Sequence, residues 1–361
     1  MTAFGGPAAH IAMMEHEVVR RRQWLTREQF LDVVGAANLI PGPNSTELAL
    51  HVGRTRGGWS GMLVAGAAFI LPSAIMVGGL AWAYVRFGAL PEAADVLYGV
   101  KPVVIAIMVQ ALWRLGRTAV RSVPLAAIGL AVVVAAALGA GELLLLAAGG
   151  ATAAAVARGF RARMLPLLLF VPGPAAGVAM QGTAATFSLG TLFATFLKIG
   201  AVLFGSGYVL LAFLRADFVE RLGWLTSQQL LDAVAIGQVT PGPLFTAATF
   251  IGFLLAGIPG AIVATVAIFL PAFVFVAASG PLIPRIRNSP TAGSALDGVT
   301  VASLGLMAVV TWQLAGEAII NLPTLGLAVL ATAALLTLRI NSAWLILGGA
   351  LFGAAAGLAA G

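Results

Sequence analysis

The chain contains the same helix-breaking triplet twice, each time inside a long apolar run. Pro41-Gly42-Pro43 recurs as Pro241-Gly242-Pro243, 200 positions later. No helix continues smoothly through such a triplet, because proline lacks an N–H donor and its ring clashes with the preceding turn. Inside a bilayer, backbone that leaves the helix must be covered by protein or line a polar cavity. The triplets therefore predict broken or re-entrant helices, with which membrane transporters build binding sites.

Composition agrees with a location in the membrane. Of the 361 residues, 60% are hydrophobic and 9% are charged, whereas soluble domains carry about 25% charged residues. Apolar runs of about 18 residues or more recur along the chain, and each is long enough for a transmembrane helix. We therefore predict an all-α polytopic membrane protein with about 10–13 membrane segments.

Charge and residue type exclude several other functions. The net charge is +7, but the basic residues lie in short clusters between apolar runs, which is typical of topology signals and not of a nucleic-acid interface. Cysteine is absent and the three histidines are not spaced as metal ligands, so we expect no metal and no cofactor. The sequence contains no nucleotide-binding loop, catalytic triad or paired catalytic carboxylates, so we do not expect an enzyme.

The chain is a duplicated unit. At an offset of 200, residues 24–46 match residues 224–246 at 11 of 23 positions, including Trp-Leu-Thr, Pro-Gly-Pro and a final threonine. One residue is then lost from the second copy, and an offset of 199 pairs Gly53 with Gly252 and Pro72 with Pro271. In both copies a Thr-x-x-Gln capping box predicts a helix start, at about residues 27 and 227.

These matches divide the chain into four parts. We predict a first transporter repeat at 1–121, connecting transmembrane helices at 122–185, a second repeat at 186–320 and C-terminal transmembrane helices at 321–361. Phe4-Gly5-Gly6 aligns with Phe204-Gly205-Ser206, but only the second copy has an apolar half-helix before it. Either the first repeat lacks this half-helix or the natural chain begins further upstream, and we favour the upstream start.

The basic residues predict how the segments cross the membrane. Arginines precede the first triplet at 20–22 and follow it at 54 and 56, so placing both flanks in the cytoplasm makes 29–53 a re-entrant hairpin. An odd number of crossings separates equivalent points of the copies, which gives the repeats inverted topology. A broken full-length span at each triplet stays open as the alternative. Two more hairpins are predicted at 186–214 and 229–254, and spans at 61–85, 96–113, 123–140, 142–157, 165–181, 258–280, 295–316, 322–338 and 342–360.

The residues around the breaks form the candidate substrate site. Proline is well placed at the first helical position, so we expect a helix that begins at Pro43 and leaves the amides of Asn44, Ser45 and Thr46 as free N–H donors. These donors lie at the positive end of the helix dipole, which is a ready anion site. Lys198 is a charged side chain inside an apolar run, so it is a functional candidate, with snorkelling to the interface as the alternative. For the triplets the alternative is a structural kink, and for the glycines it is helix packing through small residues. The candidates are Gly5, Gly6, Pro41, Gly42, Pro43, Asn44, Ser45, Thr46, Lys198, Gly205, Ser206, Gly207, Gln238, Thr240, Pro241, Gly242, Pro243 and Thr246.

Three acidic residues are candidates for ion coupling. Glu47 lies one turn after the first triplet, where it would carry a proton, bind a cation or form an ion pair with Arg54. For Asp32 and Asp232, near the starts of their helices, we favour stabilisation by the helix dipole. Lys101, at the head of a span, is interpreted as an interface anchor.

At these residues the chain resembles the chromate ion transporter family of bacteria and archaea, in its long two-domain form. The resemblance implies a secondary transporter that exports chromate across the cytoplasmic (inner) membrane, driven by an ion gradient, and so confers chromate resistance; sulfate is the similar oxyanion. Where many members have Gln two residues before a Leu-Ala pair, this chain has Glu47 directly before Leu48-Ala49. The motifs that carry the resemblance are Phe4-Gly5-Gly6-Pro7-Ala8-Ala9-His10-Ile11, Arg22-x-Trp24-Leu25, Pro41-Gly42-Pro43, Gly53, Gly66, Phe69-x-Leu71-Pro72-Ser73, Phe204-Gly205-x-Gly207-Tyr208 and Gly237-Gln238-x-Thr240-Pro241-Gly242-Pro243.

Two alternative functions remain open at this point. Within transport, the alternative is a carrier for sulfate or another oxyanion. Outside transport, it is a non-transporting membrane sensor or an intramembrane enzyme. We expect a small oxyanion and the lipid bilayer as partners and no nucleic acid, and a homodimer is left open.

Overall fold

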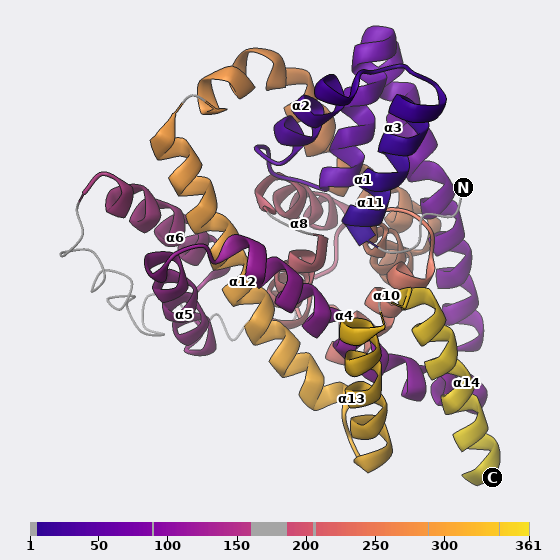
Figure 1. Cartoon of the computed structure of the whole chain (residues 1–361). Helices are drawn as coiled ribbons and strands as arrows, with labels where there is room; N and C mark the ends of the chain where they lie inside the picture. Colours follow the sequence, from indigo (N-terminus) through magenta and orange to yellow (C-terminus); the bar gives the residue numbers. More distant parts are fainter. Residues whose placement is uncertain are drawn as a thin grey trace.

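The computed structural model shows an assembly of helices (Figure 1). It describes residues 6–88, 90–159, 186–204, 207–287, 289–338 and 340–360, and within these ranges there is no β-strand. The candidates Gly5, Gly205 and Ser206 and the predicted span 165–181 lie outside the described residues. The α-helices are α1 (Gly6–Glu15), α2 (Arg27–Ala37), α3 (Asn44–Phe87), α4 (Pro91–Ala119), α5 (Val123–Ala137), α6 (Glu142–Ala157), α8 (Leu189–Val202), α9 (Leu210–Leu214), α10 (Ser227–Val239), α11 (Ala247–Arg287), α12 (Pro290–Ala318), α13 (Leu322–Thr337) and α14 (Ser342–Ala360).

The first triplet lies at the tip of a helical hairpin. Helix α2 starts at the predicted capping box, in which Thr26 and Gln29 bond each other's backbone amides, and ends before the triplet. The first arm of α3 then runs back over residues 44–56, because the Arg56 guanidinium at its end lies 5.9 Å from the ring centroid of Trp24 before α2. At about 1.5 Å per residue, arms of this length cover roughly 16–20 Å of a ~30 Å hydrocarbon core. The hairpin is therefore favoured over a broken full-length span.

Each long helix after a triplet is divided by a sharp reversal. Gly57 and Gly58 in α3 leave helical backbone angles, and so do Ala256 and Gly257 in α11, 199 positions later. Gly58 has a φ of +59° and Gly257 one of +61°, a conformation that glycine adopts without steric cost. Backbone of residue 53 lies against that of residue 61, and residue 252 lies likewise against 260, so each arm folds back on the span that follows it.

The loops before the two hairpins also repeat each other. Residues 16–21 and 215–221 both form a π-helix. The carbonyl of Val18 accepts hydrogen bonds from the amides of residues 24 and 25, and Phe218 accepts them from 224 and 225. On the exposed loop of the first copy, hydrogen bonds from Arg22 and then Arg21 lower the pKa of Glu17. The duplication seen in the sequence thus extends to backbone hydrogen bonds.

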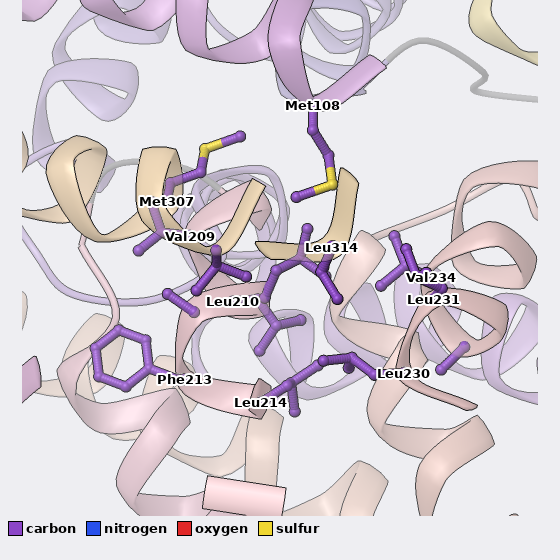
Figure 2. Packing of buried hydrophobic residues seen from close by; sticks show 14 of the residues in the cluster. Met108, Val209, Leu210, Phe213, Leu214, Leu230, Leu231, Val234, Met307 and Leu314 are labelled. Atoms are coloured by element: carbon purple, nitrogen blue, oxygen red, sulfur yellow. The ribbon is translucent and has the colours of Figure 1, made fainter. Parts of the chain in front are cut away.

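The centre of the molecule is an apolar core built from both copies. All five residues of α9 are buried, and they pack together with side chains of α4, α10 and α12, among them Met108, Leu231 and Met307 (Figure 2). Around this core, α4 packs against α12, α13 and α14, while α5 and α6 pack against α12. Glycines let some of these helices approach closely; Gly149 of α6, for example, lies against Gly298 of α12.

Helix α3 of the first copy packs along α11 of the second. Arg54 donates to the carbonyls of Val276 and, at 2.9 Å, of Ala277. Pro281 follows Ala277 by four residues and has no N–H to offer that carbonyl. The Arg54 side chain therefore satisfies a backbone acceptor that the helix itself leaves free.

The apolar helices agree with the predicted multi-pass membrane protein. Five helices of the described residues are long and apolar enough to cross a membrane, and four shorter apolar helices accompany them. The predicted spans 61–85, 96–113, 142–157, 295–316, 322–338 and 342–360 all fall on helices. The four domain boundaries and the inverted orientation of the second repeat stay predictions.

Candidate functional site

The first triplet is bonded to the glycine-rich break of the second copy. The amide of Gly42 donates a 2.7 Å hydrogen bond to the carbonyl of Leu203, which directly precedes the Phe-Gly-Ser-Gly stretch. Gly42 has a φ of +135°, so only glycine is comfortable at this position. Across the break, Asn44 donates through its amide nitrogen to Asn38 at 2.7 Å. Two segments that are far apart in the sequence thus meet here.

The second triplet meets the same stretch from its other end. Gly207 lies against Leu244 and Phe245, the two residues after the triplet. Gly242, whose φ is +134°, packs against Ser73 of α3, and Ser73 shares a 3.1 Å hydrogen bond with Thr246. We call the described residues of 38–46, 203–209 and 240–246 the break cluster.

The two helix starts in the break cluster are less open than the sequence predicted. Pro43 is the residue before α3 and not its first residue, and its carbonyl accepts from the amides of Thr46 at 2.7 Å and Glu47 at 3.1 Å. The prediction of a free Thr46 amide was therefore wrong, because the first turn tightens onto Pro43. Among the described residues, no acceptor contacts the amides of Asn44 and Ser45.

A cavity of about 560 Å³ adjoins the first triplet. Asn44 and Asn38 line it from the hairpin, Phe204 from the glycine-rich break, and Arg121 from the connection between α4 and α5. Other polar side chains in its wall are Thr118, Asp297 and Thr300. A volume of this size exceeds one small ion and suits a vestibule that leads to the helix start. Sequence reasoning missed Arg121 here, because its cluster of arginines was interpreted only as a topology signal.

Glu47 is buried beside the first triplet. Its side chain is 0% exposed, and a side chain on Gly42 would collide with its carboxylate. Neither carboxylate oxygen has a hydrogen-bond partner among the described residues, nor has the hydroxyl of Thr46. The alternative of an ion pair with Arg54 was wrong, since that guanidinium is taken up by the carbonyls of α11.

Lys198 lies in an ion-pair cluster. Its ammonium is 2.6 Å from the buried carboxylate of Asp217 and 3.7 Å from Glu142. Arg221 adds a second cation to Asp217 at 2.9 Å. The described structure therefore provides acidic partners for Lys198, which neither the substrate role nor the snorkelling alternative anticipated.

Asp232 is held in a second ion-pair cluster between the copies. Its carboxylate lies 3.2 Å from the ammonium of Lys101 on α4 and accepts a 2.8 Å hydrogen bond from Tyr84 on α3. Lys101 also donates to Gln228 at 2.5 Å. The structure thus adds a mutual ion pair that the dipole role for Asp232 and the anchor role for Lys101 did not include. Asp32, by contrast, is exposed.

The remaining candidates lie around the second triplet. The hydroxyl of Thr240 donates to the carbonyl of Ile236 at 2.9 Å and so closes the end of α10. Gln238 hydrogen-bonds the side chain of Tyr208, while its Nε2 has no partner among the described residues. In the first copy, Gly6 begins α1. None of these contacts was readable from the sequence.

Comparison with known proteins agrees with this architecture. Residues 1–155 and 190–354 match the family model described as chromate transporter. The chain belongs to the chromate transporter family. Within it, the chain is 35% identical to the chromate transport protein of Cupriavidus metallidurans, over 97% of this chain and 88% of that one. It is 34% identical to the probable chromate transport protein of Synechococcus elongatus, over 89% and 83%.

A shorter relative matches only part of the chain. The uncharacterized transporter YwrA of Bacillus subtilis is 34% identical over 123 residues, which are 34% of this chain and 69% of that protein. The matched stretch is about as long as one predicted repeat, and it covers most of YwrA. No solved structure matches the chain significantly. The family is one of transporters, and the chain is a multi-pass membrane protein.

Proposed function

We propose that this protein is a secondary transporter that exports chromate across the cytoplasmic membrane and so confers chromate resistance. Family membership and the names of two relatives, similar over most of their length, support chromate as the substrate. Export suits the charge of the ion. An inside-negative membrane potential drives anions outward with about 2.3 kcal/mol per charge and 100 mV.

The observation that carries the proposal is the meeting of three helix breaks beside a cavity with an arginine. In our proposal, chromate enters this vestibule past Arg121 and binds at the start of α3. There the amides of Asn44 and Ser45 and the side chains of Asn44 and Thr46 donate to its oxygens. Backbone donors at the positive end of a helix bind a tetrahedral dianion without placing a full charge in the membrane.

The two repeats, 1–121 and 186–320, would be related by inverted topology. The similar hairpins, reversals and π-helices at offsets of 199 to 200 residues support a common unit. The shorter relative, matched over about one repeat length, supports it as well. Alternating exposure would then come from rocking of one repeat against the other. Residues 122–185 and 321–361 would supply additional membrane helices.

Counterflow in proteoliposomes tests the proposal. Vesicles that contain the purified protein are loaded with chromate, sulfate or molybdate, and exchange with labelled external anion is followed. We expect chromate exchange that Arg121→Gln slows by about tenfold, whereas Arg158→Gln, at the exposed end of α6, leaves it unchanged. Exchange of sulfate but not chromate would favour the other oxyanion carrier. No exchange of any anion would favour a sensor or an intramembrane enzyme.

A further inference from the structure

Glu47 is a buried acidic side chain beside the proposed anion site. It is 0% exposed and lies against Gly42, within one helical turn of the amides of Asn44 and Ser45. Its two carboxylate oxygens are not hydrogen-bonded to any described residue. An ionised carboxylate in such a place is costly unless a cation or hydrogen-bond donors compensate it.

The described surroundings offer Glu47 no cation. Helix α11, packed along α3, has no titratable residue between 247 and 279. On α3 itself, the titratable group that follows Glu47 is His51, one helical turn away. Arg54, further along, is bound to carbonyls of α11. His51 is 8% exposed, and its Nε2 is without a partner among the described residues.

Among the described residues, no hydrogen bond joins the Glu47 carboxylate to a titratable group of the other packed elements. On α1, the ring of His10 packs edge-on against Phe69. On α2, Glu28 and Asp32 are exposed, and Asp232 of α10 is paired with Lys101. His51 is therefore the titratable group to be separated from Glu47 by experiment.

The second copy has no equivalent acid. Ala247 occupies the position of Glu47 and is itself buried. In the second copy, the hydroxyl of Thr246 shares a hydrogen bond with Ser73. Beside the first triplet, Ala272 takes the place of Ser73. The hydroxyl of Thr46 therefore has no hydrogen-bond partner among the described residues. Only the first of the two similar helix starts therefore has an acidic side chain beside it. Its charge can change when that side chain gains or loses a proton.

We propose that Glu47 is a proton site that must be occupied for an oxyanion to bind at the start of α3. This inference rests on the proposed function. An ionised Glu47 repels a dianion one turn away, whereas the neutral acid removes that repulsion and can donate a hydrogen bond. Proton and oxyanion therefore bind together, and by linkage each strengthens the other's binding. A dianion that carries one proton keeps a net charge of −1, so an inside-negative potential still drives it outward.

Chromate binding at several pH values tests the inference. Dissociation constants are measured with purified protein in detergent from pH 6 to 9 for the wild type, Glu47→Gln, His51→Asn and Glu28→Gln. At each pH all variants are exposed to the same mixture of chromate and hydrogen chromate. The ratio of the wild-type Kd to the variant Kd therefore reports proton binding by the protein and not by the ligand. For Glu47→Gln we expect a ratio near one at low pH that rises by up to about tenfold per pH unit once Glu47 ionises.

Three outcomes would overturn the proton site: a ratio that stays constant with pH, a pH dependence removed by His51→Asn in place of Glu47→Gln, or affinity that follows sodium and not protons. Glu28→Gln removes the same charge from an exposed position of the hairpin and should behave as wild type. If Glu47→Gln does not fold, infrared difference spectra of the wild type decide. Chromate added at alkaline pH should produce the carbonyl band of a protonated carboxylic acid, and its absence would overturn the inference. Failure of the wild type to bind chromate at any pH would instead remove the proposed function and the inference with it.

Discussion

The ion pair between Lys101 and Asp232 allows a quantitative test of how the two copies are held together. The side chains are 16% and 5% exposed, and Tyr84 is the additional donor to the carboxylate. Lys101→Met would leave Asp232 buried with that hydroxyl alone. Removing one partner of a buried pair costs about 3–5 kcal/mol, and the remaining hydrogen bond places our expectation near 3 kcal/mol.

A double-mutant cycle separates the pair from its neighbours. Asp232→Asn retains an acceptor for Tyr84 but leaves the ammonium of Lys101 with Gln228 as its remaining partner, so we expect a loss of about 1–3 kcal/mol. The double variant leaves no buried charge unpaired and should cost less than the sum of the single changes. The expected interaction energy is about 2 kcal/mol.

Thermal unfolding of the purified protein in detergent, followed by tryptophan fluorescence, measures these differences. We expect Lys101→Met to lower Tm by roughly 5 °C or more, and Arg158→Met, an exposed control, to leave it unchanged. Additive effects of the two substitutions, or a Lys101→Met protein as stable as the wild type, would refute the ion pair as a link between the copies.

Three further substitutions test other contacts. Gly42→Ala forces a φ of +135° on alanine and a collision with Glu47, so we expect the free energy of unfolding to fall by about 1–3 kcal/mol and chromate exchange to be lost. Gly35→Ala, with open space around it, should behave as wild type, and equal effects of the two substitutions would contradict this reasoning. Lys198→Met leaves Asp217 with Arg221 alone and should lower stability by about 1–3 kcal/mol, partly restored by adding Asp217→Asn; an unchanged Tm would disprove the structural role of Lys198. Ser73→Ala removes a buried hydrogen bond to Thr246 and should cost about 1 kcal/mol in thermal unfolding, since Ala272 occupies the equivalent place beside the first triplet; a much larger loss would argue against a simple hydrogen bond.

The sequence by itself determined the helical segments and the places where they break. Proline and glycine act on the backbone within a turn, a capping box spans four residues, and a hydrophobic run needs no distant partner. For these reasons the helix start at residue 27 and the interruption at 41–43 agree with the structure, and the predicted spans 142–157, 322–338 and 342–360 match helices to within a residue. The basic flanks predicted a hairpin but left a broken full-length span open, and the packing of α2 against the first arm of α3 favours the hairpin.

The tertiary structure alone decided which breaks and charges meet. Gly42 bonds Leu203, and Lys101 pairs with Asp232, across long stretches of sequence. Such contacts depend on how the helices pack, and residues near them in the chain carry no sign of it. Dipole, anchor and substrate roles were reasonable for isolated charges, but in a low-dielectric interior opposite charges that packing brings together form ion pairs. Glu47 is the exception among the described residues, since packing gave it no such partner.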